Sequence, residues 1–163
     1  MNKIALFAGM ALLLFSCGRE PKTCTEDNGL PPAAPGTFDA ALAEKLGADE
    51  YGMKPYVMAF LKAGPNRNLD STESANLQAA HMANINRMAE EGKLAIAGPF
   101  MDDGAIRGIY IFNVASVEEA EALTKTDPAI KAGSLVMELH PWYGSAALSE
   151  IPERHKLAAK KSF

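Results

Sequence analysis

The sequence predicts an α+β domain whose elements follow the order β-α-β-β-α-β. Three observations support this fold class: four short apolar segments, two segments with helical spacing of apolar residues, and an Asp-Gly turn signal between the middle two strands. A leader and a polar segment come first, and the folded part begins near Thr37. What remains is large enough for one hydrophobic core.

The first 16 residues, MNKIALFAGMALLLFS, have the order of a bacterial export signal. One lysine precedes an apolar run that ends at Phe15, and this run is shorter than the about 20 apolar residues that span a bilayer. The following LFSC, at 14–17, resembles a lipobox, so we expect a lipid anchor on Cys17. Because Gly18 is not the aspartate that commonly retains lipoproteins in the inner membrane, we expect the outer membrane. A soluble secreted protein cut nearby is the alternative.

Residues 17–36 are rich in proline, glycine and charge, which predicts a disordered tether. Its chain length corresponds to an average reach of about 25 Å. If Cys17 carries lipid, Cys24 has no partner within the chain, and no disulfide framework is expected. Removal of the leader takes away only Lys3 among the charged residues, leaving 15 basic and 20 acidic side chains. A net charge near −5 argues against a nucleic-acid partner.

The first elements of the domain are a short helix and a strand. Residues 37–53 form a helical extension in which Phe38, Leu42 and Leu46 are spaced by four and Gly47 ends the helix. The segment PYVMAFLKA, at 55–63, is apolar at both alternating sets of positions. Such a strand needs cover on both faces.

A long helix follows, to about Glu91, with Ser71 or Thr72 as its cap and Gly92 as its stop. Its apolar stripe contains His81 between apolar neighbours. These neighbours are Leu77, Ile85 and Met88.

The remaining elements are a hairpin, a helix and a last strand. KLAIAGPF and GIYIFNV, at 93–100 and 108–114, flank the turn signal and predict a hairpin. Ser116 caps a helix that the Asp127-Pro128 step ends. SLVMELHPWY closes the domain, and residues 144–163 form a helical tail.

This order is the ferredoxin-like arrangement, an antiparallel sheet with two helices on one face. The strands at 55–63 and 108–114 are nevertheless apolar on both sides, so the second face needs a partner. We expect a homodimer packed sheet to sheet, of the dimeric α/β-barrel type. Residues 37–50 or 144–163 are rival covers for that face.

Several features together resemble the YCII-related domain family over about residues 54–143. These features are His81, GKLAIAGPF at 92–100, Asp127-Pro128, Gly133 and the closing ELHPWY. The resemblance implies a ferredoxin-like fold, dimeric sheet packing and a histidine and aspartate proposed as an active-site pair, here His81 and Asp127. Against the short members of that family, this chain adds the lipoprotein leader, the tether and the two helical extensions.

The pair also makes chemical sense from the residues alone. A carboxylate on one imidazole nitrogen fixes the tautomer and leaves the other nitrogen free to move a proton. We expect cofactor-free isomerisation or elimination of an unknown small molecule, with a structural His-Asp pin or a non-catalytic binding or interaction module as the alternatives. Phe100, His140 and Trp142 are candidate substrate contacts, although packing or a place at the dimer seam also explains them. The three histidines lack metal-ligand spacing, and no cofactor motif is present.

Overall fold

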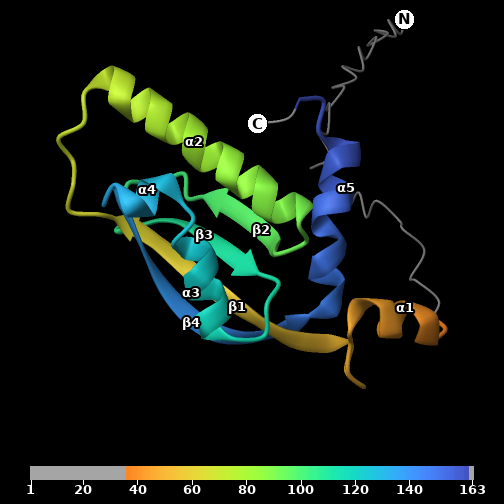
Figure 1. Ribbon diagram of the computed structural model, residues 1–163. Coiled ribbons are helices and arrows are strands. Elements are labelled where there is room, and N and C mark those ends of the chain that lie inside the picture. The colour runs from red at the N-terminus through yellow and green to blue at the C-terminus, as the bar shows by residue number, and fades with distance from the viewer. Residues whose placement is uncertain (1–35, 162–163) are drawn as a thin grey trace, which may run out of the picture. The chain divides into compact units, whose positions relative to one another are not determined.

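Four strands form one antiparallel sheet in the order β2-β3-β1-β4 (Figure 1). The computed structural model describes residues 36–161, so the predicted leader, Cys17 and Cys24 lie outside the described residues. The strands are β1 (Met53–Ala63), β2 (Leu94–Pro99), β3 (Ile106–Phe112) and β4 (Leu135–Ser145). The helices are α1 (Ala40–Leu46), α2 (Ser71–Glu90), α3 (Val117–Thr124), α4 (Pro128–Lys131), η1 (Ala146–Glu150) and α5 (Ile151–Ala158). The predicted ferredoxin-like fold is therefore confirmed.

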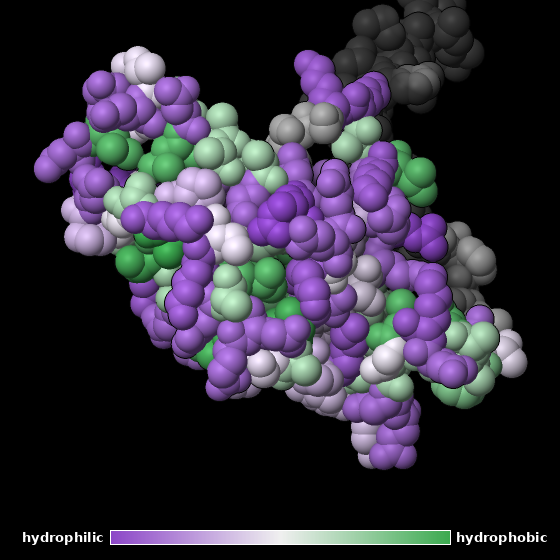
Figure 2. Space-filling model, in the orientation of Figure 1, coloured by the Kyte–Doolittle hydropathy of each residue, from purple (hydrophilic) through white to green (hydrophobic). Residues whose placement is uncertain are grey.

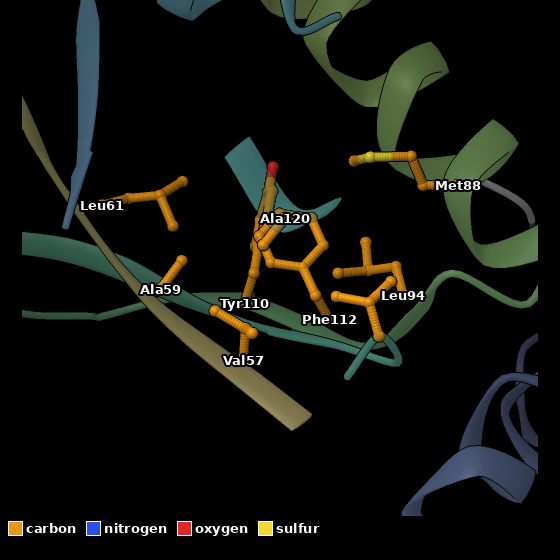
Figure 3. Packing of buried hydrophobic residues seen from close by; sticks show 9 residues of the cluster. Val57, Ala59, Leu61, Met88, Leu94, Tyr110, Phe112 and Ala120 are labelled. Carbon is orange, nitrogen blue, oxygen red and sulfur yellow. The ribbon is translucent and has the colours of Figure 1, made fainter. Parts of the chain in front are cut away.

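The main core lies between the sheet and the layer of α2, α3 and α4 (Figures 1 and 3). Side chains from one face of β1 and β3 meet the inner sides of α2 and α3 there. In Figure 3 the Tyr110 ring stands on β3 with its hydroxyl pointing away from the sheet. The buried members are Val57, Ala59, Leu61, Met88, Leu94, Tyr110, Phe112, Val114 and Ala120. Residues from Phe38 onward form one compact unit that contains this whole core.

Within residues 36–161, a small apolar cluster lies at one end of the second face of the sheet. There, Leu148 of η1 packs against a small cluster that contains Tyr56 and Ile111. The Tyr56 hydroxyl donates to the carbonyl oxygens of Ser145 and Ala146 at 3.0 and 3.2 Å, which fixes the start of the tail. Of the two rival covers expected from sequence, the residue 144–163 segment thus occupies part of this face. Farther along the face, Phe60 pairs with Ile109 and both remain half-buried.

Helix α2 begins one residue earlier than the sequence suggests. Its cap is Asp70, whose carboxylate accepts from the backbone N–H groups of Thr72 and Glu73 at 2.8 Å each. The Glu73 side chain in turn accepts from the Asp70 N–H, which completes a capping box. The expected cap at Ser71 or Thr72 is therefore wrong, because a carboxylate at 70 satisfies two amide donors. Gly92 follows the helix with φ of 68°, as its predicted role as a stop requires.

The short helix α4 is absent from the sequence prediction. α3 ends at Thr124 with Lys125 as its C-cap, earlier than the predicted end at the Asp127-Pro128 step, and that step starts a new turn of helix. Asp127 is the N-cap of α4 and Pro128 takes its first position, where a missing N–H costs nothing. The helix is only four residues long, too short to give a periodic pattern.

The surface seen from the helical side is mostly hydrophilic, with separated apolar areas (Figure 2).

A hydrogen-bonded contact joins the segment after α1 to β4. The Asp49 carboxylate accepts from the Tyr143 hydroxyl and from the Met53 N–H. Within residues 36–161, no helix has the length and apolar character needed to cross a membrane.

Candidate active site

His81 lies at the middle of α2 on the side that faces the sheet. Its neighbours one and two turns farther along this side, Asn84 and Met88, are also buried. Only 7% of His81 is exposed. The histidine that interrupts the predicted apolar stripe is thus part of the interior rather than a surface residue.

The imidazole of His81 contacts the carboxylate of Asp127 with both oxygens near one nitrogen. Nδ1 lies 2.8 Å from Oδ2 and 3.0 Å from Oδ1. An ionised carboxylate only accepts, so Nδ1 carries a proton and donates it. Asp127 is 1% exposed, which places the contact in a water-poor environment where it is strong.

The second ring nitrogen of His81 contacts a tyrosine. Nε2 lies 3.3 Å from the hydroxyl of Tyr110 on β3, and the two rings are stacked with an interplanar angle of 19°. Burial, and then the negative charge of Asp127, raise the pKa of Tyr110 well above its ordinary value. The phenol therefore keeps its proton and is the donor in its contact with Nε2. Asp127, His81 and Tyr110 form one continuous chain of hydrogen bonds.

Asp127 is held by the start of α4 as well as by the histidine. Its Oδ1 accepts from the backbone N–H of Ala129 at 2.8 Å, as an N-cap does. One carboxylate thus begins a helix and orients an imidazole. The position of the carboxylate is consequently fixed by backbone, not only by side-chain packing.

A second polar contact joins α2 to the segment just before Asp127. Arg87 donates from Nη2 to the Asn84 side-chain oxygen at 2.9 Å and to the Thr126 hydroxyl at 3.0 Å. Its Nη1 reaches the Glu91 carboxylate at 2.8 Å. Asn84 lies one turn after His81, and Thr126 directly precedes Asp127. The Arg87 contact therefore helps to hold His81 and Asp127 opposite each other.

Both ring nitrogens of His81 contact side chains of the domain itself. Two grooves among residues 36–161, one lined mainly by α2, β2 and α5 and the other mainly by α1, η1 and α5, do not include His81, Asp127 or Tyr110. The Tyr110 hydroxyl occupies Nε2 of His81, so this nitrogen is not open to a ligand in the present arrangement. The 3.3 Å separation is at the long end for a hydrogen bond, so this contact is the weaker of the two that His81 makes.

Comparisons with known proteins agree with this fold. The model of the YCII-related domain matches residues 56–143, which is more than half of the chain. The chain belongs to the YCII-related domain family. It is 33% identical over 73 residues to the uncharacterised protein YjpA of Bacillus subtilis (strain 168), covering 44% of this chain and 84% of YjpA.

A solved structure gives a more distant likeness to this YCII-related chain. It is the 5-chloro-2-hydroxyhydroquinone dehydrochlorinase TftG from Burkholderia phenoliruptrix AC1100, in complex with 2,5-dihydroxybenzoquinone. The likeness has a TM-score of 0.42 at 20% identity and covers 55% of this chain and 93% of TftG. The extensions outside residues 56–143, among them α1 and α5, are not part of the family match.

The other candidate residues of this YCII-related domain are not gathered around His81. His140 pairs in register with Met58, and Trp142 with Tyr56, on the face of the sheet opposite α2. His140 bonds the exposed Glu138 carboxylate at 3.0 Å. Phe100 directly follows β2 and is 46% exposed. The sheet separates His140 and Trp142 from His81. Their role as substrate contacts therefore stays a prediction.

Tyr110 is the site residue that the sequence reasoning missed. The alternation of the third strand separates Tyr110 and Phe112 from Ile109 and Ile111, and so indicates which face Tyr110 takes. A tyrosine on the buried, helix-covered face needs a partner for its hydroxyl. His81 is the polar residue in the middle of the helix stripe above it, and that pairing was the available signal.

Proposed function

We propose that this YCII-related chain is a small-molecule enzyme in which His81 transfers a proton, oriented by Asp127. The observation that carries the proposal is the buried chain of hydrogen bonds from Asp127 through His81 to Tyr110. A carboxylate that fixes Nδ1–H leaves Nε2 as the basic atom and stabilises the imidazolium that forms. Such a pair suits isomerisation or elimination, which require proton transfer.

The proton moves between the substrate and Nε2 of His81. In an isomerisation, Nε2 takes a proton from one substrate atom and returns it to another. In an elimination, the electron pair left by the proton forms the new double bond as the leaving group departs. Either step requires the Tyr110 hydroxyl to move away from Nε2. This contact breaks more easily than the contact of His81 with Asp127, because it is longer, at 3.3 Å. The released hydroxyl, kept protonated by burial, then donates to an oxygen of the substrate.

A non-catalytic role is the alternative, and the burial of the pair favours it. With His81 7% exposed and Asp127 1% exposed, the three side chains also serve as a pin between α2, α4 and β3. Buried polar networks fix a unique packing without any reaction. In that case the domain is a ligand-binding or interaction module.

The setting that we propose is the cell envelope. The LFSC segment supports a lipid on Cys17 that holds the domain at the outer membrane through the tether at 17–36. The half-buried pair Phe60 and Ile109 on the second face supports a homodimer packed sheet to sheet. In such a dimer His140 and Trp142 lie at the seam, while each His81 lies on the opposite, helix-covered side of its own sheet.

Thermal-shift screening with small acids and phenols tests the proposed ligand class. Compounds that stabilise the wild-type protein but not His81→Asn identify ligands of the proposed site, and NMR of the incubated compounds then detects products. Asp103→Asn is the control, because Asp103 is exposed in the turn between β2 and β3 and lies outside the proposed site. Stabilisation that survives His81→Asn and yields no product supports the binding module instead.

A further inference from the structure

A groove runs between the second half of α2 and the helix α5, with the edge strand β2 as its floor. Its volume is about 490 Å³, within the range of small-molecule sites. Because α5 lies beyond residues 56–143, this groove depends on a segment that the family match does not include. It is also separate from the His81 site, since neither His81 nor Asp127 lines it.

The floor and one end of the groove are apolar. Ile85 and Ala89 of α2 face Ile96 of β2, and Ile151 and Pro152 close the end where α5 begins. The lining residues run from Ile151 past the end of α5 to Lys161, so the groove follows the whole length of this helix, about 12 Å at 1.5 Å per residue. An extended apolar chain fits this shape better than a flat ring does.

The other end of the groove is positively charged. Lys156, Lys160 and Lys161 line it, and Glu90 is its one acidic lining residue. Lys156 is paired with Glu153 at 2.6 Å, whereas Lys160 and Lys161 have no salt bridge to any residue within 36–161. The whole chain has a net charge of −4, so this basic end differs in sign from the protein as a whole.

We propose that the groove binds a free medium-chain carboxylate, with the chain along the apolar floor and the carboxylate at Lys160 and Lys161. The groove is apolar at Ile151 and cationic at Lys161. This arrangement is complementary to an amphiphile with one anionic head group. Burial of the chain provides affinity, and the lysines select the sign of the head group. The proposal is independent of the function of His81.

Calorimetric titration with decanoate below its micelle concentration tests this site. The protein begins at Gly36, because the compact unit from Phe38 contains the whole core. One decanoate should bind per chain, and decylammonium, with the same tail and the opposite charge, should bind at least about tenfold more weakly. Ala97→Trp, an exposed β2 position on the groove, should block binding without changing charge.

The charge variants complete the test. Lys160→Glu with Lys161→Glu should weaken decanoate binding at least about tenfold, whereas Lys125→Glu with Lys131→Glu, the same charge change outside the groove, should not. Equal binding of decanoate by both double variants would overturn the proposal. So would binding to phosphatidylglycerol vesicles through Lys160 and Lys161 without binding of free decanoate, which would make the basic end a membrane contact.

Discussion

Asp127 holds the ring of His81 with both carboxylate oxygens, at 2.8 and 3.0 Å from Nδ1, while it caps the helix α4. One side chain therefore joins the site to the backbone of the neighbouring element. The proposed chemistry and the stability of this corner of the domain depend on the same carboxylate. Variants at Asp127 must be interpreted with both effects in mind.

Asp127→Ala should destabilise the protein by about 3 kcal/mol or more. The substitution leaves a buried imidazole without its partner and removes the α4 cap. Each of these changes lowers the free energy of unfolding. Urea unfolding measures the change in free energy. Asp39→Ala, which removes only the exposed cap of α1, is the control and should cost about 1 kcal/mol or less. Equal small losses in both proteins would show that the His81 contact contributes nothing to stability.

Tyr110 should make the folded protein sensitive to alkali. Burial raises the pKa of Tyr110 above the 10.0 of a free tyrosine, so above pH 10 the unfolded chain loses this proton while the native state keeps it. The contribution is complete below pH 10 and falls as pH rises, by up to about 1.4 kcal/mol per pH unit. In Tyr110→Phe this part of the decline should be absent. Urea unfolding at several pH values from 9 to 11 measures it, with Tyr51→Phe, an exposed tyrosine, as the control.

The second face of the sheet should be a dimer interface. Buried apolar surface contributes roughly 25 cal/mol per Å² before the costs of association. Sedimentation equilibrium of the protein from Gly36 should give a dimer at micromolar concentration, and Ile109→Lys should give a monomer. Leu157→Lys, an exposed position on α5, should leave the dimer intact. A monomeric wild type would mean that η1 and α5 cover enough of this face alone.

The mature protein should begin at a lipid-bearing Cys17. Mass spectrometry of its first peptide should find a diacylglyceryl cysteine, and Cys17→Ala should abolish both the added mass and membrane fractionation. An unmodified terminus at another residue would exclude the anchor and, with it, the outer-membrane location.

The sequence predicts the order of the long elements and the helical layer because each depends on a repeated pattern. The apolar strand segments and the stripe on α2 indicate the type of each long element, and the fold follows from the order of these elements. α4 has only four residues and no repeat, so the pattern does not reveal it. The cap of α2 was misplaced because serine, threonine and aspartate stand together at 70–72, and only geometry selects Asp70.

The contact between His81 and Asp127 was predictable, but the partner of the second ring nitrogen of His81 was not. Helix spacing places His81 over the sheet, and the resemblance to the YCII-related family supplies Asp127 as its partner. Whether the second ring nitrogen faces an open pocket depends on which side chain of β3 reaches it, and alternation gives only the face of Tyr110. The α2 and α5 groove likewise depends on where the tail packs, which no local pattern specifies.

The central claim, that His81 transfers a proton to and from a small molecule, is tested most directly by deuterium incorporation. Small acids and phenols are incubated with the protein in D₂O, and NMR follows the loss of carbon-bound proton signals. The wild-type protein should label at least one class of compound, and His81→Asn should do so at least about 100-fold more slowly. Circular dichroism must show that the variant remains folded. Equal labelling by both proteins, or labelling by neither, would contradict the claim and leave His81 as a structural pin between α2 and β3.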